Sequence, residues 1–127
     1  MVTFRQTIPI LRIFNVEKAK EFYVDFLGFQ IDFEHRFDDN SPLYMQVSRD
    51  GLTLHSSEHY GDACPGSTVF VGMDGLEEFQ KELAARNYTY LNPGIERDED
   101  IGLKTMETID PFGNRIRFSE DLDTDKE

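Results

Sequence analysis

Two short stretches of this sequence, "GLTLHSSE" (51–58) and "GNRIRFSE" (113–120), resemble each other and decide the fold. They superpose at an offset of 62 residues, which aligns His55 with Arg117. The strand and helix starts that precede them align at an offset of 60 residues. A repeat of about 60 residues in a chain of 127 indicates two copies of one supersecondary unit.

Each copy is predicted to have the element order β-α-β-β-β. Alternating apolar residues predict the strands, and an apolar stripe with Asn15 as N-cap and Gly28 as stop predicts the first helix. The predicted strands are residues 7–14, 29–37, 43–49, 52–58, 67–73, 88–92, 103–109 and 115–119, and the predicted helices are residues 15–28 and 75–87. We therefore expect an α+β protein with one domain over residues 1–127, built of two modules at about 5–60 and 66–120 and an acidic C-terminal tail.

Side chains alternate across a strand, so each predicted sheet has two different faces. The aliphatic face, expected to carry the helices, holds Pro9, Leu11, Ile13, Leu52, Leu54, Val69, Val71, Met73, Ile116 and Phe118. The opposite face holds Ile8, Ile10, Arg12, Thr53, His55, Ser57, Thr68, Phe70, Gly72, Arg115, Arg117 and Ser119. Such a mixture of aromatic, hydroxyl and cationic groups is typical of a ligand cleft. A solvent face and a dimer contact fit the pattern equally well.

The chain has 25 acidic and 13 basic residues, which gives a formal net charge of -12. This balance argues against a nucleic-acid partner, because phosphate neutralisation requires a positive surface. It would attract cationic ligands, although the same excess also serves solubility. Part of it is local, in "ERDED" (96–100) and in the tail "EDLDTDKE" (120–127), and we expect both segments to be solvated or frayed.

The sequence shows no sign of a membrane or secreted protein. Its apolar runs fall short of the roughly 20 residues of a membrane helix, and its N-terminus lacks the basic and apolar regions of a signal peptide. We therefore expect no membrane partner and a cytoplasmic location. Cys64, the single cysteine, has no partner for an internal disulfide and no local base, and we interpret it as incidental.

Two segments resemble a known family, namely "NVEKAKEFYVDFLGF" (15–29) and "DPFGNRIRF" (110–118). Asp110 and Asn114 in the second segment are expected to form a turn, because Asx side chains bond their own backbone. With the βαβββ repeat, these segments are similar to the vicinal oxygen chelate superfamily, which includes glyoxalases, bleomycin-resistance proteins and dioxygenases. The resemblance covers roughly residues 5–120. It implies a cupped mixed sheet with helices on its outer face, and it is specific for the fold rather than for an activity.

Enzymes of this superfamily hold a divalent metal with His or Gln from the first strand and Glu from the last strand of each module. The resemblance places the four ligand positions at Ile8, His55, Thr68 and Arg117. An aliphatic side chain, a threonine and an arginine do not replace such ligands, and a guanidinium repels a cation. We therefore expect no metal, no other cofactor and no catalytic residue, unless His35 or His59 joins His55.

Within the superfamily the bleomycin-resistance proteins are the most similar group, and they bind their ligand rather than transform it. This resemblance implies a homodimer whose two clefts take up a cationic glycopeptide antibiotic, with aromatic rings stacked on its flat heterocycles. The present chain has no tryptophan, and Ile101 stands where that group commonly has one. Stacking would then rest on Phe33, Phe37, Tyr44 or Phe70.

The candidate ligand-binding residues are Phe33, Phe37, Tyr44, His55, Ser57, Phe70, Ile101 and Arg117. His55 either contacts a ligand or is hydrogen-bonded within the sheet. Arg117 either binds a ligand carboxylate or pairs with Glu107 or Asp32. Simple alternation along the second strand places Ile31, Phe33, His35 and Phe37 on one face.

The leading interpretation is an acidic, metal-free protein that sequesters a small molecule, such as a bleomycin-type antibiotic, in clefts of a homodimer. The alternative is a metal-dependent lyase or oxygenase of the glyoxalase or dioxygenase kind, which requires a metal at His55 with unexpected further ligands. A third interpretation is a relative in fold only, with a regulatory or interaction role. A sheet face around His55 that is filled by core side chains would favour this third interpretation.

Overall fold

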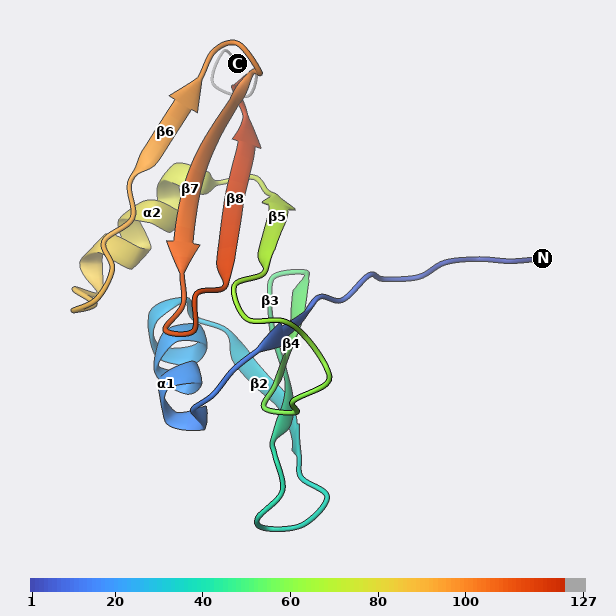
Figure 1. Cartoon of the computed structure of the whole chain (residues 1–127). Coiled ribbons are helices and arrows are strands. Elements are labelled where there is room, and N and C mark those ends of the chain that lie inside the picture. Colours follow the sequence, from blue (N-terminus) through green and yellow to red (C-terminus); the bar gives the residue numbers. More distant parts are fainter. Residues whose placement is uncertain (123–127) are drawn as a thin grey trace. The chain divides into compact units, whose positions relative to one another are not determined.

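The computed structural model describes residues 1–122 and divides into two compact units, one of Met1–Pro65 and one that begins at Gly66 (Figure 1). The first unit, here called the first module, holds β1 (Ile10–Arg12), α1 (Val16–Lys20), the π-helical turn η1 (Glu21–Phe26), β2 (Gln30–His35), β3 (Tyr44–Arg49) and β4 (Leu52–Ser57). The second module holds β5 (Thr68–Gly72), α2 (Leu76–Ala85), β6 (Ile95–Asp98), β7 (Leu103–Ile109) and β8 (Arg115–Asp121). None of the helices within residues 1–122 is long and apolar enough to cross a membrane.

Each module forms its own four-stranded mixed sheet, and the two sheets have equivalent strand orders. The order is β1-β4-β3-β2 in the first module and β5-β8-β7-β6 in the second. In both sheets the first strand pairs in parallel with the last, while the remaining pairs are antiparallel. Ile10 lies opposite His55, and Phe70 lies opposite Arg117, so the register of one module reproduces that of the other. The predicted α+β fold with a repeated βαβββ module is confirmed.

The first helix begins as predicted, with the Asn15 side chain accepting a hydrogen bond from the backbone N–H of Lys18 at 2.9 Å. It continues as the π-helical turn η1 and ends before Gly28, whose φ of 82° suits glycine. The core of the first module consists of the buried residues Leu11, Ile13, Ala19, Phe22, Tyr23, Phe26, Leu27, Met45, Val47 and Leu54. One face of the sheet thus faces the helix, and we call the other face the open face.

The core of the second module lies between α2 and one face of its sheet. Its buried apolar residues are Leu76, Phe79, Leu83, Met106, Ile116 and Phe118. The ring of Phe79 on α2 meets the ring of Phe118 on β8 edge-on, with 5.1 Å between centroids. The helix therefore covers the predicted aliphatic face, and the face with Phe70 and Arg117 is the open face of this module.

Glu120 corrects the expectation that the acidic tail begins as a solvated segment. Its side chain is buried, because β8 runs on to Asp121 and Leu122 is buried as well. The carboxylate accepts hydrogen bonds from the backbone N–H groups of Gly75, at 2.7 Å, and Leu76, at 3.4 Å. Glu120 therefore caps the N-terminus of α2, whose N-cap glycine has no side chain of its own to do so. Residues 123–127 of the predicted tail lie outside the described residues.

The predicted strand at residues 88–92 is wrong, since the sixth strand is β6, Ile95–Asp98. Pairing with β7 is set by the tight turn that follows β6, where the Gly102 N–H donates to the Asp98 carbonyl at 2.9 Å. From this turn the register runs back to Ile95 opposite Met106 and no further. Most of the "ERDED" segment is therefore strand, and its charged side chains are solvated, as expected, because this edge strand is exposed.

The turn "DPFGN" joins β7 to β8 and holds the start of β8 in place. The Asp110 carboxylate accepts hydrogen bonds from the backbone N–H groups of Phe112 and Asn114, at 2.8 and 2.9 Å, and from the Asn114 amide at 2.9 Å. The Asn114 side-chain oxygen accepts from the Ser67 N–H at 3.2 Å, which ties this turn to the start of β5. Asp110 and Asn114 thus act as turn formers, as predicted.

Candidate functional site

A chain of hydrogen bonds centred on His55 runs across the open face of the first module. His55 Nδ1 lies 2.6 Å from the Tyr44 hydroxyl, and His55 Nε2 lies 2.9 Å from Gln46 Oε1. The Gln46 amide nitrogen donates in turn to Asp32 Oδ2 at 3.0 Å. Tyr44 and Gln46 share one face of β3, and Gln46 lies opposite His55 in the sheet register. His55 is therefore hydrogen-bonded within the sheet, and its contact with a ligand stays a prediction.

The chemistry of the chain fixes the direction of each hydrogen bond. An ionised carboxylate only accepts, so the NH₂ group of Gln46 must face Asp32 and its carbonyl oxygen must face His55. In the imidazole form with the proton on Nε2, which this Gln46 orientation favours, Nδ1 accepts from the Tyr44 hydroxyl. The hydrogen of Tyr44 is committed to His55, which leaves the lone pairs of its oxygen available to accept a hydrogen bond.

Asp32 anchors the chain and stays ionised. The hydrogen bond from Gln46 lowers the pKa of this carboxyl group most, and hydrogen bonds with Ser48 and Gln30 lower it further, while burial opposes them. Asp32 reaches Gln46 because β2 contains an irregularity in register between Ile31 and Phe33.

This irregularity corrects the prediction that Ile31, Phe33, His35 and Phe37 share one face. Ile31 lies opposite Val47, a core residue, whereas Phe33 lies opposite Gln46 and His35 opposite Tyr44 on the open face. The extra residue in β2 shifts the alternation by one position, so strict period-two reasoning fails at this point.

Aromatic rings surround His55 on the open face. The Phe33 and Tyr44 rings both meet the His55 ring edge-on, with centroid distances of 5.9 and 5.1 Å. Burial raises the pKa of Tyr44, and the negative charge of Asp62 raises it further, so Tyr44 keeps its proton at neutral pH. Phe33 is 43% exposed, which leaves part of an aromatic surface next to the polar chain.

Ser57 is buried and positions the loop that follows β4. Its hydroxyl donates to Asp62 Oδ2 at 2.6 Å and accepts from the backbone N–H of His59 at 3.0 Å. The hydroxyl is thus occupied within the module, and its effect on the face is to hold Asp62 near Tyr44. Its predicted direct contact with a ligand remains untested.

In the second module the open face holds an arginine pair joined by one carboxylate. Glu107 Oε1 accepts from Arg117 Nε at 3.0 Å, and Glu107 Oε2 accepts from Arg115 Nη1 at 3.0 Å. Of the two internal partners considered for Arg117, the structure shows Glu107. The hydrogen bond from Arg117 is the largest cause of the lowered pKa of Glu107, and Arg115 adds to it. Phe70 lies beside Arg117 on the neighbouring strand and is 61% exposed.

Two predicted site residues are not brought to these clusters. Phe37 is 87% exposed beyond the end of β2, and the ring contacts that join Phe33 and Tyr44 to His55 do not include it. Ile101 is 66% exposed in the turn before β7. Glu107 lies four positions, roughly 13 Å, further along β7 than Leu103, the first residue of that strand. Their roles in binding stay predictions.

Gln46 and Asp32 are the members of the polar chain that the list of candidate residues lacks. The signal for Gln46 was its position two residues after Tyr44 on the same strand. No comparable signal marks Asp32, because an irregular register is not visible in the residue pattern.

The side chains at the ligand positions of the superfamily's metal enzymes do not fit a divalent cation. Both ring nitrogens of His55 are engaged in hydrogen bonds, and Arg117 presents a positive charge. Within residues 1–122 no group of three or more His, Cys, Asp or Glu side chains is arranged to hold a metal ion. We therefore derive no reaction step through a metal.

Comparisons with known proteins agree with this architecture. Residues 1–125 match a family described as glyoxalase superfamily protein. A bleomycin-binding protein in complex with bleomycin is 23% identical, with a TM-score of 0.68 over 93% of this chain and 99% of that chain. The bleomycin-binding protein of Streptomyces verticillus, complexed with copper(II)-bleomycin, is 26% identical, with a TM-score of 0.67 over 93% and 97%. A glyoxalase/bleomycin resistance protein/dioxygenase from Alicyclobacillus acidocaldarius is 16% identical, with a TM-score of 0.68 over 94% of each chain. No curated protein matches this chain.

Proposed function

This chain belongs to the glyoxalase superfamily, and we propose that it is a metal-free small-molecule-binding protein of the bleomycin-binding type. It sequesters a cationic or aromatic ligand, of which a bleomycin-type antibiotic is one candidate, on the open face of its first module. The 26% identical protein of Streptomyces verticillus, which binds copper(II)-bleomycin, supports this choice among the activities found on the fold.

The hydrogen-bond chain from Asp32 through Gln46 and His55 to Tyr44 is the observation on which the proposal rests, and the direction inferred for it decides which ligands the site accepts. With its hydrogen committed to His55, the Tyr44 oxygen can only accept from a ligand. The carboxylates of Asp32 and Asp62, near the two ends of the chain, add negative charge. This arrangement favours a ligand that brings N–H donors and positive charge, and it opposes a ligand carboxylate or phosphate.

The exposed ring of Phe33 supplies the apolar part of the proposed site. It contacts the His55 ring edge-on and leaves 43% of its surface exposed. A flat heterocycle stacked on this ring would place its substituents next to Tyr44. An aromatic cation thus satisfies both the ring and the polar chain.

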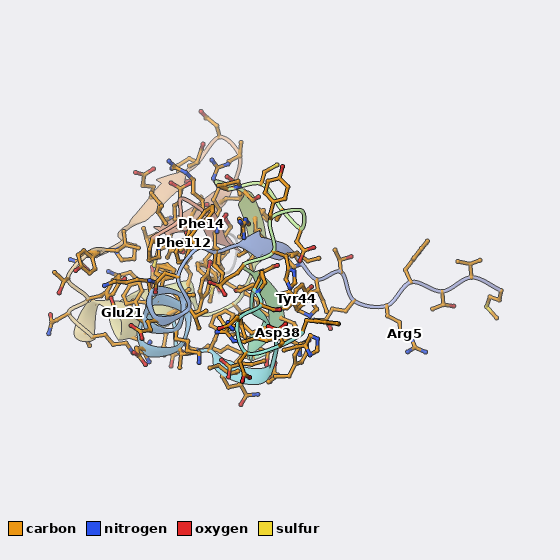
Figure 2. The ribbon with its side chains drawn as sticks, turned by 60° about the horizontal axis from the view of Figure 1, so that its bottom comes forward. Arg5, Phe14, Glu21, Asp38, Tyr44 and Phe112 are labelled. Atoms are coloured by element: carbon orange, nitrogen blue, oxygen red, sulfur yellow. The ribbon has the colours of Figure 1, made fainter. Side chains whose placement is uncertain are left out.

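We further propose that the binding protein is a homodimer. Residues 1–7 are exposed and form an extended arm that precedes β1 and bears Arg5, as Figures 1 and 2 show. Two apolar side chains on the arm, Val2 and Phe4, are 81% and 92% exposed. An apolar segment of this kind gains stability when a second subunit covers it.

Isothermal titration calorimetry with metal-free bleomycin tests the proposed function. We expect saturable heat for the wild-type protein and a roughly tenfold weaker affinity for Tyr44→Phe, because one hydrogen bond to a charged group is lost. Tyr60→Phe is the matched control, since Tyr60 is 93% exposed on the loop after β4, and it should bind like the wild type.

Two results would contradict the proposal. One is a stoichiometric divalent metal in elemental analysis of the purified protein, which would favour the enzymatic alternative. The other is the absence of heat both with bleomycin and with simple aromatic cations such as benzylammonium. Heat with benzylammonium alone would retain the site and exclude bleomycin as its ligand.

A further inference from the structure

We propose that the open face of the second module holds a separate binding site for an aromatic carboxylate, formed by the guanidinium group of Arg117 and the ring of Phe70. The first-module site favours cations, so this second site goes beyond the proposed function. Arg117 and Phe70 both belong to the second module, so the proposed site is built within that unit.

Arg117 has hydrogen-bond donors that its partner in the sheet does not use. A guanidinium has five N–H donors in one plane, and only Nε of Arg117 donates to Glu107. Within residues 1–122 its two terminal nitrogens have no other partner. Together they present two parallel N–H groups, the arrangement that binds a carboxylate through both oxygens.

Glu107 positions the site rather than neutralising it. Its two oxygens take one N–H group each from Arg115 and Arg117, so one carboxylate holds two guanidinium groups side by side. Both arginines are about half exposed, with 45% and 53% of their side-chain surfaces accessible. The cluster retains one positive charge in a chain of formal net charge -12, and an anion is attracted to it locally.

Phe70 adds an aromatic surface on the strand next to Arg117. It lies opposite Arg117 on the parallel strand β5, and neighbouring strands are about 4.8 Å apart. Its ring is 61% exposed and has no ring contact within the described part of the chain. The next residue on the same face is Gly72, where an added Cβ atom would meet nothing within 4 Å. A flat ring can therefore lie on Phe70 while its carboxylate reaches Arg117.

The experiment is a titration of the full ¹⁵N-labelled chain with phenylacetate, followed by NMR. Phenylacetamide, which has the same shape without the charge, is the ligand control. We expect phenylacetate to shift the signals of Phe70, Gly72 and Arg117 with an affinity at least tenfold higher than that of phenylacetamide. The Arg117→Gln variant should lose this preference.

Two further variants separate the site from a general effect of charge. Arg97→Gln removes the same charge from β6, where Arg97 lies opposite the core-facing Lys104, and it should bind phenylacetate like the wild type. Gly72→Leu places a side chain on the open face where there is room for it, so it should fold and still bind at least fivefold more weakly.

The proposal is overturned if phenylacetate and phenylacetamide bind alike, or if Arg117→Gln and Arg97→Gln weaken binding equally. It is also overturned if phenylacetate shifts no signal, or if the signals of β5 and β8 change only with protein concentration, which would assign this face to a second copy of the chain. Benzylammonium, added separately, reports on the first-module site through Tyr44 and Gln46, so the two proposals fail independently.

Discussion

At the scale of single residues, equivalent positions of the two modules do opposite chemistry. His55 and Arg117 occupy matching places in the repeat. His55 lies in the middle of a chain of hydrogen bonds that makes Tyr44 an acceptor, whereas Arg117 keeps unused donors beside Glu107. A metal ligand needs a free lone pair and no positive charge of its own. Both ring nitrogens of His55 are already hydrogen-bonded, and the Arg117 guanidinium is positively charged and has no lone pair to offer.

The titration of Glu107 tests this arrangement of charges. In the folded wild-type protein we expect the Glu107 pKa to lie below its unfolded value of about 4.3, because Arg117 stabilises the carboxylate. The ion pair then contributes stability above the unfolded pKa and loses it as the pH falls through the folded pKa. Carbon-detected NMR should show that Arg117→Gln raises the Glu107 pKa more than Arg115→Gln does. An equal or reversed order would contradict the larger effect of Arg117 on the Glu107 pKa.

At the scale of elements, the two modules use the same glutamate of the repeat differently. In the first module Asn15 caps α1, and Glu58 instead accepts from the Leu43 N–H at 2.9 Å. In the second module the N-cap is a glycine, and Glu120 supplies the cap from β8 while pairing with the buried Lys104 at 3.2 Å. A carboxylate from a strand thus fixes the start of α2 against its sheet.

Replacing Glu120 should therefore destabilise the protein strongly. Glu120→Ala removes the helix cap and the buried carboxylate that pairs with the buried Lys104 ammonium, at a cost of about 3–5 kcal/mol in the free energy of unfolding. Urea denaturation followed by circular dichroism measures this. Glu82→Ala, which breaks the more exposed Arg86–Glu82 pair, is the control and should cost less than about 1 kcal/mol. An equal loss in the free energy of unfolding for the two variants would contradict the proposed role of the buried Glu120 carboxylate.

At the scale of the whole molecule, the chain combines two modules whose open faces differ in polarity. The first presents hydrogen-bond acceptors with nearby carboxylates, and the second presents arginine donors. The homodimer that we propose involves the exposed N-terminal arm of the first module, which lies on the strand β1 side of that module (Figure 1).

Sedimentation equilibrium tests the homodimer. We expect the wild-type protein to sediment with twice the mass of the chain and Phe4→Ser to dissociate at least tenfold more readily, because an apolar ring is returned to water. Tyr60→Ser removes an equally exposed ring elsewhere and should leave the mass unchanged. A monomeric wild-type protein at micromolar concentration would contradict the proposal.

Much of the fold follows from the sequence because its signals are local and periodic. The offset repeat predicts two equal modules, Asn15 and Gly28 bound the first helix, and "DPFGN" forms its turn. The residue pattern predicts the sixth strand at residues 88–92 instead of at β6, because the pairing of β6 is set by the turn at Gly102 rather than by the residues of the strand.

The sequence by itself determined the family and the repeat, since these depend on residue types at fixed spacings. Only the tertiary structure decided which side chains meet. The irregular register of β2 brings Asp32 to Gln46, and the pairing of β7 with β8 brings Glu107 to Arg117. These contacts join residues 10 to 14 positions apart on different strands. Their geometry depends on strand register. One added residue in a strand changes this register, and the local residue pattern does not predict where such a residue is added.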